Sequence, residues 1–196
     1  MTRLFRTRRP DGEQVLLPYG HTVVVRPIRP TDATLLLDGF ARLSVESRRL
    51  RFLGGKSTLT ARDVRYFTEI DHRDREAVVA LDLAGRGVGV ARFVRQGAHP
   101  RAAEVAIAVV DEWQGRGAGT ELLARLAQRA DDEGIGCFTA MIADDNSAVV
   151  GLVRAAGARM AVTSVSDGAV RFTVPVGALL TESHRADHLL PTPCFA

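Results

Sequence analysis

The stretch "AEVAIAVVDEWQGRGAGTELL", residues 103–123, decides the fold of this chain. Its first half alternates small and branched apolar residues after Glu104, which is typical of a half-buried strand. Three alternate glycines follow, Gly115, Gly117 and Gly119, and leucines then recur at helical spacing. We therefore expect a strand, a tight glycine loop and a helix, in that order.

The glycine loop has the chemistry of an anion site. Glycine adopts positive φ and lets a ligand approach the backbone closely. The first N–H groups of the following helix lack internal acceptors, and the helix dipole adds positive potential there. Such a corner suits a phosphate or pyrophosphate, with Arg116 as an additional charged contact. From glycine spacing alone, a plain strand-to-helix turn remains equally open.

Two familiar nucleotide-binding patterns do not fit this loop. A Rossmann G-x-G-x-x-G needs a third glycine where Thr120 or Leu122 stands. A P-loop needs a lysine before Ser or Thr, and Lys56 is the only lysine of the chain. Dinucleotide and nucleoside-triphosphate readings are therefore disfavoured.

Composition indicates one globular domain. Of the 196 residues, 46% are hydrophobic and 25% are charged, which is ordinary for such a domain. No apolar run reaches the roughly 18–20 residues of a membrane helix, and the first ten residues lack the apolar segment of a signal peptide. Two cysteines make no disulfide framework, so we expect a cytoplasmic protein. A net charge of +3 is too small to indicate nucleic acid, and no membrane partner is expected.

Outside the opening stretch, hydrophobic periodicity predicts both helices and strands. Strands are expected at residues 21–28, on both sides of a turn at 85–87, and at 103–110, 137–142, 159–165 and 169–176. Helices are expected at 30–43, from Ser44 to Gly54, after the Thr60/Asp63 capping box, after the glycine loop, and at 146–156. The simplest organisation is an N-terminal extension at 1–20, one domain at 21–176 and a C-terminal tail at 177–196.

The loop and its flanks resemble a known superfamily. "QGRGAG" at 114–119 fits Q-x-x-G-x-G, and V-x-D-E-W precedes it at 109–113. This resembles the coenzyme A loop of the GNAT acetyltransferases. The resemblance implies a single α/β domain with a mixed, mostly antiparallel central sheet flanked by helices. It also implies that loop N–H groups hold the pyrophosphate of acetyl-CoA and that the preceding strand pairs with pantetheine. The residues that match these roles are Ile107, Ala108, Val109, Gln114, Gly115, Arg116, Gly117, Ala118, Gly119 and Thr120.

A second signature of the superfamily follows at residues 144–158, "DDNSAVVGLVRAAGA". The resemblance implies that Asn146 begins a helix and lies beside the pantetheine arm. Many members carry a tyrosine seven residues later, as general acid for the leaving thiolate. Val153 stands at that position, so the general acid stays unassigned.

Residues 25–55 and 68–81 resemble the acetyltransferase domain of bacterial protein-lysine acetyltransferases, which modify acyl-CoA synthetases. This implies acetyl-CoA as co-substrate and a protein with an accessible lysine as acceptor. Those proteins often carry a further regulatory or synthetase-like domain, for which the residues before 21 leave no room. A small amine or protein N-terminus as acceptor, or a coenzyme-binding regulatory module with little activity, are the alternatives.

Glu104 is the candidate general base. Alternation places it with Ala106 and Ala108 on one face of the strand, where small side chains leave room for a ligand. A lysine with pKa ~10.4 lies more than three units from deprotonation at pH 7, about 4 kcal/mol, so a base is needed. Spacing alone favours a solvated glutamate at a strand start. The resemblance implies the role of general base.

Alternate polar residues at His72, Asp74 and Glu76 invite a metal site. A solvated loop is the stronger interpretation, because neither a cysteine nor a second histidine supports them. No metal is therefore expected. The family resemblance implies a third interpretation, in which residues 71–76 line the entrance for a protein substrate.

Overall fold

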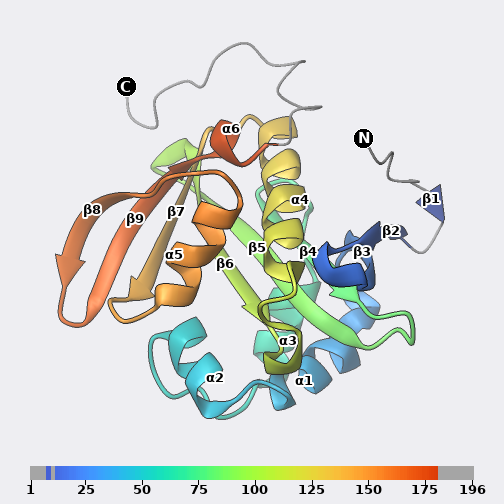
Figure 1. The fold of residues 1–196 in the computed structure, drawn as a ribbon. Helices are drawn as coiled ribbons and strands as arrows, with labels where there is room; N and C mark the ends of the chain where they lie inside the picture. Colours follow the sequence, from blue (N-terminus) through green and yellow to red (C-terminus); the bar gives the residue numbers. More distant parts are fainter. Residues whose placement is uncertain (1–7, 10–11, 181–196) are drawn as a thin grey trace.

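The computed structural model describes residues 8–9 and 12–180, and a single mixed sheet organises them (Figure 1). Its nine strands follow the order β1-β2-β3-β4-β5-β6-β7-β9-β8. They are β1 (Arg8–Arg9), β2 (Gly12–Leu16), β3 (Thr22–Pro27), β4 (Arg75–Leu81), β5 (Gly87–Gln96), β6 (His99–Val109), β7 (Cys137–Ala143), β8 (Ala161–Ser166) and β9 (Ala169–Pro175). Neighbours are antiparallel except β6 and β7, which are parallel. The expected mixed, mostly antiparallel sheet flanked by helices is confirmed.

Helices cover both faces of this sheet. They are α1 (Ala33–Ala41), α2 (Val45–Phe52), α3 (Ala61–Thr68), α4 (Ala118–Asp132), α5 (Ser147–Ala155) and α6 (Val176–Leu179). Figure 1 shows α4 and α5 in front of the sheet and α1–α3 at its lower end. Among the described residues, no helix is both long and apolar enough to cross a membrane.

Strand β4 separates two apolar cores, because its successive side chains point to opposite faces. Val78 and Ala80 pack in one cluster with the leucines of α4, such as Leu122. Ala77 and Val79 pack in the other, with Ile28 and with partly buried leucines of α1. The α1–α3 side and the α4–α5 side of the sheet are therefore distinct environments.

The helix starts agree with the sequence signals. Ser44 caps α2 by accepting a hydrogen bond from the Ser47 backbone N–H. Thr60 and Asp63 form the expected capping box at α3. Asn146 caps α5 through the Val149 N–H. These caps depend only on neighbouring residues, which is why local sequence predicts them.

The segment expected to precede the domain contributes to its sheet. Strand β2 pairs with β3, and Val15 and Leu17 pack against the main core while Leu16 is 55% exposed. The turn residues of 1–20 mask this short apolar alternation in the sequence. Residues 1–7 and 10–11 lie outside the described part of the chain.

The expected C-terminal tail also begins within the fold. Residues 176–179 form α6, and Leu179 and Leu180 are buried in the main core. A single helical turn is too short to show a periodic pattern, so α6 could not be predicted from hydrophobic spacing. Residues 181–196, which make up the rest of the expected tail, lie outside the described residues.

Candidate active site

A cleft opens where the parallel strands β6 and β7 separate. They pair only from Ala102 to Glu104 on β6, opposite residues 137–139 of β7. Beyond Glu104, β6 continues to Val109 and pairs with β5 alone. The cleft has a volume of about 1040 Å³ and is lined by both strands, the glycine loop, α2 and α5. This volume is of the size that takes a large cofactor.

The free edge of β6 offers backbone hydrogen-bonding groups to this cleft. Val110 N–H donates to the Val88 carbonyl at 3.0 Å, which fixes the hydrogen-bond phase of the β5–β6 ladder. Alternation then turns the N–H and C=O groups of Ile107 and Val109 away from β5, toward the gap. Ala108 pairs with Val90 and lines the cleft with its side chain. An extended ligand in the gap could therefore pair with these backbone groups, as a neighbouring strand would.

The glycine loop closes one end of the cleft. Gly115 and Gly117 adopt φ of 71° and 87°, a left-handed conformation that favours glycine. No side chain caps α4, so the first N–H groups of the helix stay available to a ligand. Gln114, Gly115, Gly117, Gly119 and Thr120 all line the cleft. The loop geometry fits an anion held at the start of α4.

Two residues of the predicted loop set lie elsewhere. Ala118 is buried in the core at 1% exposure. The guanidinium of Arg116 lies 5.5 Å from the ring centre of Trp113, a cation–π contact. Neither residue is among those that line the cleft. Their places follow from α4 packing and from the aromatic neighbour, which spacing within the motif does not reveal.

Residues 16–19, before β3, pack against the glycine loop. A Cβ at Gly117 would lie 2.7 Å from Cδ of Pro18. Leu17 is buried in the core, and residues 16–19 line the same cleft. These residues are absent from the set predicted from the sequence. Their signal was a short apolar run between two turns, "VLLP" at residues 15–18.

Hydrogen bonds connect the residues that precede the glycine loop to the start of α2. Asp111 accepts from Ser44 N–H at 2.9 Å, and from the hydroxyls of Ser44 at 2.7 Å and Ser47 at 3.0 Å. Gln114 Nε2 donates to Ser47 Oγ and to the Val109 carbonyl, both at 3.1 Å. Burial favours a raised pKa for Asp111, but these hydrogen bonds outweigh it and hold the pKa below its ordinary value. Helix α2 is thus fixed beside the cleft.

Glu104 stands at the fork of the two strands. Its side chain lines the cleft and is exposed, and no hydrogen bond or ion pair to it is found within the described residues. Val94 is its partner on β5, and the next position on that face pairs Arg92 with Ala106. An unpaired carboxylate at the cleft floor is free to accept a proton, directly or through water.

Asn146 and Val153 lie on the opposite wall. Both line the cleft, and both are buried, at 6% and 4% exposure. The Asn146 side chain accepts the Val149 N–H at 3.3 Å and so fixes the start of α5. Val153 offers no proton donor at the position where the superfamily resemblance would place a tyrosine.

The polar loop at 72–76 is more ordered than expected. Glu76 is only 1% exposed, and its carboxylate binds His72 Nδ1 at 2.8 Å and Arg129 Nε at 3.1 Å. Asp74 pairs with Arg95 instead. The solvated-loop interpretation is therefore wrong for Glu76, because α4 brings Arg129 over it. No group of three metal-ligating side chains occurs in the part of the chain that the structure describes.

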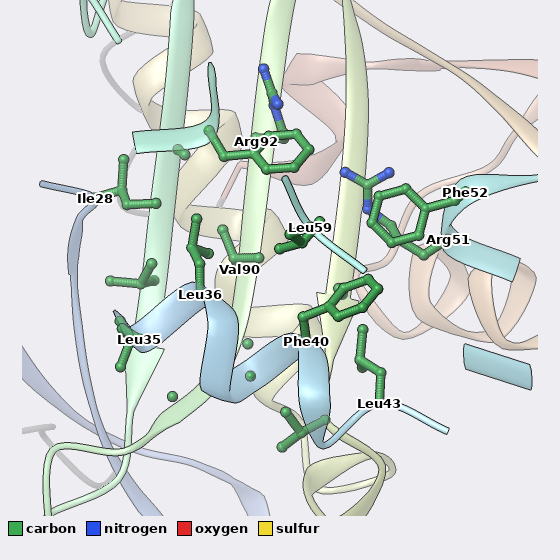
Figure 2. Close-up of a pocket in the computed structure, with 18 residues that line it drawn as sticks. Ile28, Leu35, Leu36, Phe40, Leu43, Arg51, Phe52, Leu59, Val90 and Arg92 are labelled. Atoms are coloured by element: carbon green, nitrogen blue, oxygen red, sulfur yellow. The ribbon is translucent and has the colours of Figure 1, made fainter. Parts of the chain in front are cut away.

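A second, apolar pocket of about 80 Å³ lies on the α1–α3 side of the sheet (Figure 2). Leu35, Leu36 and Phe40 of α1 form much of its wall, and Arg51 and Arg92 are its charged members. Four residues line both this pocket and the cleft, namely Leu43, Arg51, Phe52 and Ala108. The two hollows are therefore neighbours across β6.

Comparison with known proteins gives one consistent result. The sequence profile described as the Acetyltransferase (GNAT) family matches residues 44–158. Acetyltransferase Pat of Mycolicibacterium smegmatis is 34% identical over 131 residues, 66% of this chain and 39% of that protein. The chain thus spans about two fifths of the length of this relative.

Solved structures agree with the sequence comparison. The GNAT domain of S. lividans PAT is 34% identical, with a TM-score of 0.77 over 83% of this chain and 95% of that one. A phosphinothricin acetyltransferase from Sinorhizobium meliloti, solved in complex with acetyl-CoA, shares the fold at 22% identity. Its TM-score is 0.64, over 78% of this chain and 88% of that one.

Proposed function

Because the chain belongs to the acetyltransferase (GNAT) family, we propose that it transfers the acetyl group of acetyl-CoA to a lysine side chain of a protein, with Glu104 as general base. The observation that carries the proposal is the unpaired Glu104 carboxylate at the fork of β6 and β7. It lies between the cleft suited to acetyl-CoA and the face that carries the second pocket. When Glu104 removes a proton from the acceptor lysine, the neutral amine is left next to the acetyl donor.

The role of Glu104 follows from the proton balance of the reaction. The acceptor ammonium must lose a proton before it can attack, which costs about 4 kcal/mol for an ordinary lysine at pH 7. A carboxylate in hydrogen-bond reach supplies that step, directly or through one water. Acetyl-CoA supplies an activated thioester, and among the described residues no cysteine lines the cleft to take the acetyl group first.

The remaining residues bind and orient the co-substrate. In this proposal the N–H groups at the start of α4 bind the pyrophosphate, and backbone groups of Ile107 and Val109 pair with pantetheine, although the Val109 carbonyl already accepts from Gln114. We assign to Val109 N–H the role of polarising the thioester carbonyl. Thiols have pKa values near ~8.5, so departure as a thiolate needs less assistance than the amine does, consistent with Val153 in place of a tyrosine.

A protein acceptor is supported by the resemblance of residues 25–55 and 68–81 to protein-lysine acetyltransferases. Acyl-CoA synthetases are the acceptor class that this resemblance suggests. The cytoplasm, where such enzymes and reduced cysteines occur, is the compartment we propose.

The test uses purified protein, labelled acetyl-CoA and three acceptors: an acyl-CoA synthetase, a small diamine and a peptide with a free N-terminus. Label on a synthetase lysine is expected. Label confined to the diamine or to the N-terminus would contradict the protein-lysine assignment, and binding of acetyl-CoA without transfer would indicate a regulatory module. Lys56 is the only lysine of this chain, so mass spectrometry distinguishes self-acetylation from transfer.

Glu104→Gln tests the base. We expect turnover to fall at least tenfold while the Kd for acetyl-CoA changes less than twofold, because the amide keeps the shape and loses the basicity. Glu69→Gln removes an exposed carboxylate at the end of α3 and serves as the control. Equal turnover in wild type and Glu104→Gln would remove Glu104 from the mechanism.

A further inference from the structure

The α1–α3 side of the sheet, the acceptor side of the proposed reaction, holds a buried cation with an unsatisfied donor atom. Arg92 on β5 is only 9% exposed. Its Nη2 is buried and has no hydrogen-bond partner among the described residues. A buried, unsatisfied charged donor costs folding free energy, so it calls for an explanation beyond packing.

Two aromatic rings hold this guanidinium, and Tyr66 also accepts a hydrogen bond from it, but Nη2 stays without a partner among the described residues. Arg92 Cζ lies 4.6 Å from the ring centre of Tyr66 and 4.9 Å from that of Phe67, both on α3. Cation–π contacts stabilise the charge through the ring faces. The planar N–H fork therefore keeps donors for a further acceptor, and carboxylate is the group that it matches best.

A second arginine lies at the same pocket. Arg51 of α2 lines both the apolar pocket and the cleft, and in Figure 2 both guanidinium groups lie above the apolar side chains of α1. Burial first, and then the like charge of Arg92, lower the pKa of Arg51 to about 10, while Glu104 opposes this effect. The acceptor side therefore has an excess of positive charge.

This positive charge affects which acceptors can bind. Lysine approaches as a cation, and two nearby guanidinium groups repel it unless the acceptor also brings negative charge. Arg92 pairs with Ala106 across the β5–β6 ladder, which makes it a diagonal neighbour of Glu104. Diagonal positions on adjacent strands lie roughly 7–8 Å apart. An amine at Glu104 and a carboxylate at Arg92 would be separated by a few bonds.

We propose that Arg92, assisted by Arg51, binds a carboxylate of the acceptor, with the adjoining aliphatic carbons in the pocket of α1. The inference rests on the proposed acetyl transfer and adds an acceptor requirement to it. The carboxylate comes either from an acidic side chain beside the modified lysine or from the free α-carboxylate of an amino acid. Both sources share one chemistry, an aliphatic carboxylate near an amine.

A binding experiment tests the site without any transfer. Butyrate and its uncharged analogue butyramide are titrated into the protein by calorimetry, with and without coenzyme A. We expect wild type to bind butyrate at least tenfold more tightly than butyramide. Arg92→Gln should abolish this preference, whereas Arg62→Gln should keep it, because Arg62 is exposed on α3 and lines neither hollow.

Matched acceptor pairs test the same requirement in transfer. L-lysine is compared with 1,5-diaminopentane, and a Glu-Lys peptide with the corresponding Gln-Lys peptide. In wild type the carboxylate should lower KM at least tenfold in one pair. In Arg92→Gln that ratio should fall to within twofold of one, with the KM for acetyl-CoA unchanged. The pair that responds identifies the source of the carboxylate.

The outcomes separate this inference from the proposed function. Transfer without any carboxylate preference, or a preference that Arg92→Gln retains, overturns the inference and leaves acetyl transfer standing. Selective butyrate binding without transfer to any amine supports the anion site and contradicts the proposed function. Arg92→Lys keeps the charge but loses the planar fork, so partial recovery of the preference is expected. Circular dichroism and melting curves confirm that each variant folds.

Discussion

At the scale of single residues, Gly117 shows why the loop needs glycine for two separate reasons. Its φ of 87° is a conformation that L side chains rarely adopt, and a Cβ would also meet Pro18 at 2.7 Å. Gly115 has a similar φ of 71°, but a Cβ there would meet nothing within 4 Å. A substitution at Gly115 therefore introduces backbone strain alone, whereas one at Gly117 introduces strain and a steric contact.

We predict that Gly117→Ala weakens acetyl-CoA binding more than Gly115→Ala does. Each variant carries the left-handed penalty of about 1–2 kcal/mol. Only Gly117→Ala also pushes Pro18 and the loop apart, so its Kd should rise at least tenfold. Isothermal titration with acetyl-CoA measures both. Equal Kd values for the two variants would show that contact with Pro18 has no role in shaping the loop.

At the scale of elements, Asp111 connects the glycine loop to α2, and Arg51 and Phe52 of α2 line the apolar pocket. Opposite walls of the cleft are also joined, because Arg49 of α2 binds Asp145 before α5 at 2.7 Å. That pair is exposed, so solvent screens it and its contribution to stability is small. Asp111 makes three hydrogen bonds to Ser44 and Ser47 at the start of α2, so it is the stronger determinant of where α2 lies.

We predict that Asp111→Asn raises the KM for the acceptor severalfold and leaves the Kd for acetyl-CoA within threefold of wild type. The amide replaces one acceptor oxygen by a donor and breaks at least one bond to Ser44 or Ser47. Steady-state kinetics with varied acceptor measure the effect. Asp167→Asn, in the exposed β8–β9 turn, is the control. A change in acetyl-CoA Kd alone would contradict the assignment of α2 to the acceptor side.

A buried ion pair connects β3 to α1. Arg26 donates to both carboxylate oxygens of Asp32 at 2.7 Å, and Arg29 N–H donates at 2.8 Å. Burial alone would raise the pKa of Asp32, but these bonds outweigh it and lower the pKa below 3.8. A lowered pKa in the folded state gives stability that is present above about pH 4 and lost as pH falls through the folded pKa.

We predict that Asp32→Asn costs about 3 kcal/mol in the free energy of unfolding at pH 7, because it leaves Arg26 buried without its partner. The difference from wild type should shrink as pH falls through the lowered pKa of folded Asp32, because wild-type Asp32 is then protonated too. Urea unfolding at pH 7, 4 and 3 measures this trend. Asp38→Asn, at an exposed pair with Arg42, should show little dependence. A pH-independent difference for Asp32→Asn would contradict the linkage.

At the scale of the whole molecule, the N-terminal strand β2 and the glycine loop pack together. Leu17 is 3% exposed in the main core, its neighbour Leu16 is 55% exposed, and Pro18 supports Gly117. Stability and coenzyme binding should therefore respond together to changes in this segment.

We predict that Leu17→Ala lowers the free energy of unfolding by about 2–5 kcal/mol, as for other buried leucines, and weakens acetyl-CoA binding. Leu16→Ala should change stability by no more than about 0.5 kcal/mol, since its side chain is largely exposed. Denaturant melts and calorimetry measure both. Coenzyme affinity unchanged in folded Leu17→Ala would show that the segment supports the sheet without supporting the loop.

Local signals in the sequence predicted much of the element map. The caps at Ser44, Thr60 and Asn146 begin their helices as expected. The predicted alternation of β6, with Glu104 and Ala106 on one face, agrees with the ladder to β5. Strand β2 and the burial of Glu76 were missed, because each depends on a partner distant in sequence.

The sequence by itself determined the strand, the glycine loop and the helix, since caps, alternation and positive φ depend on near neighbours along the chain. It also determined the family, through two spaced signatures. Only the tertiary structure decided that β6 and β7 part after Glu104, that Pro18 supports Gly117, and that Arg51 and Arg92 share a pocket. These features depend on strand register and on helices packing across the sheet. No periodicity within one segment encodes them.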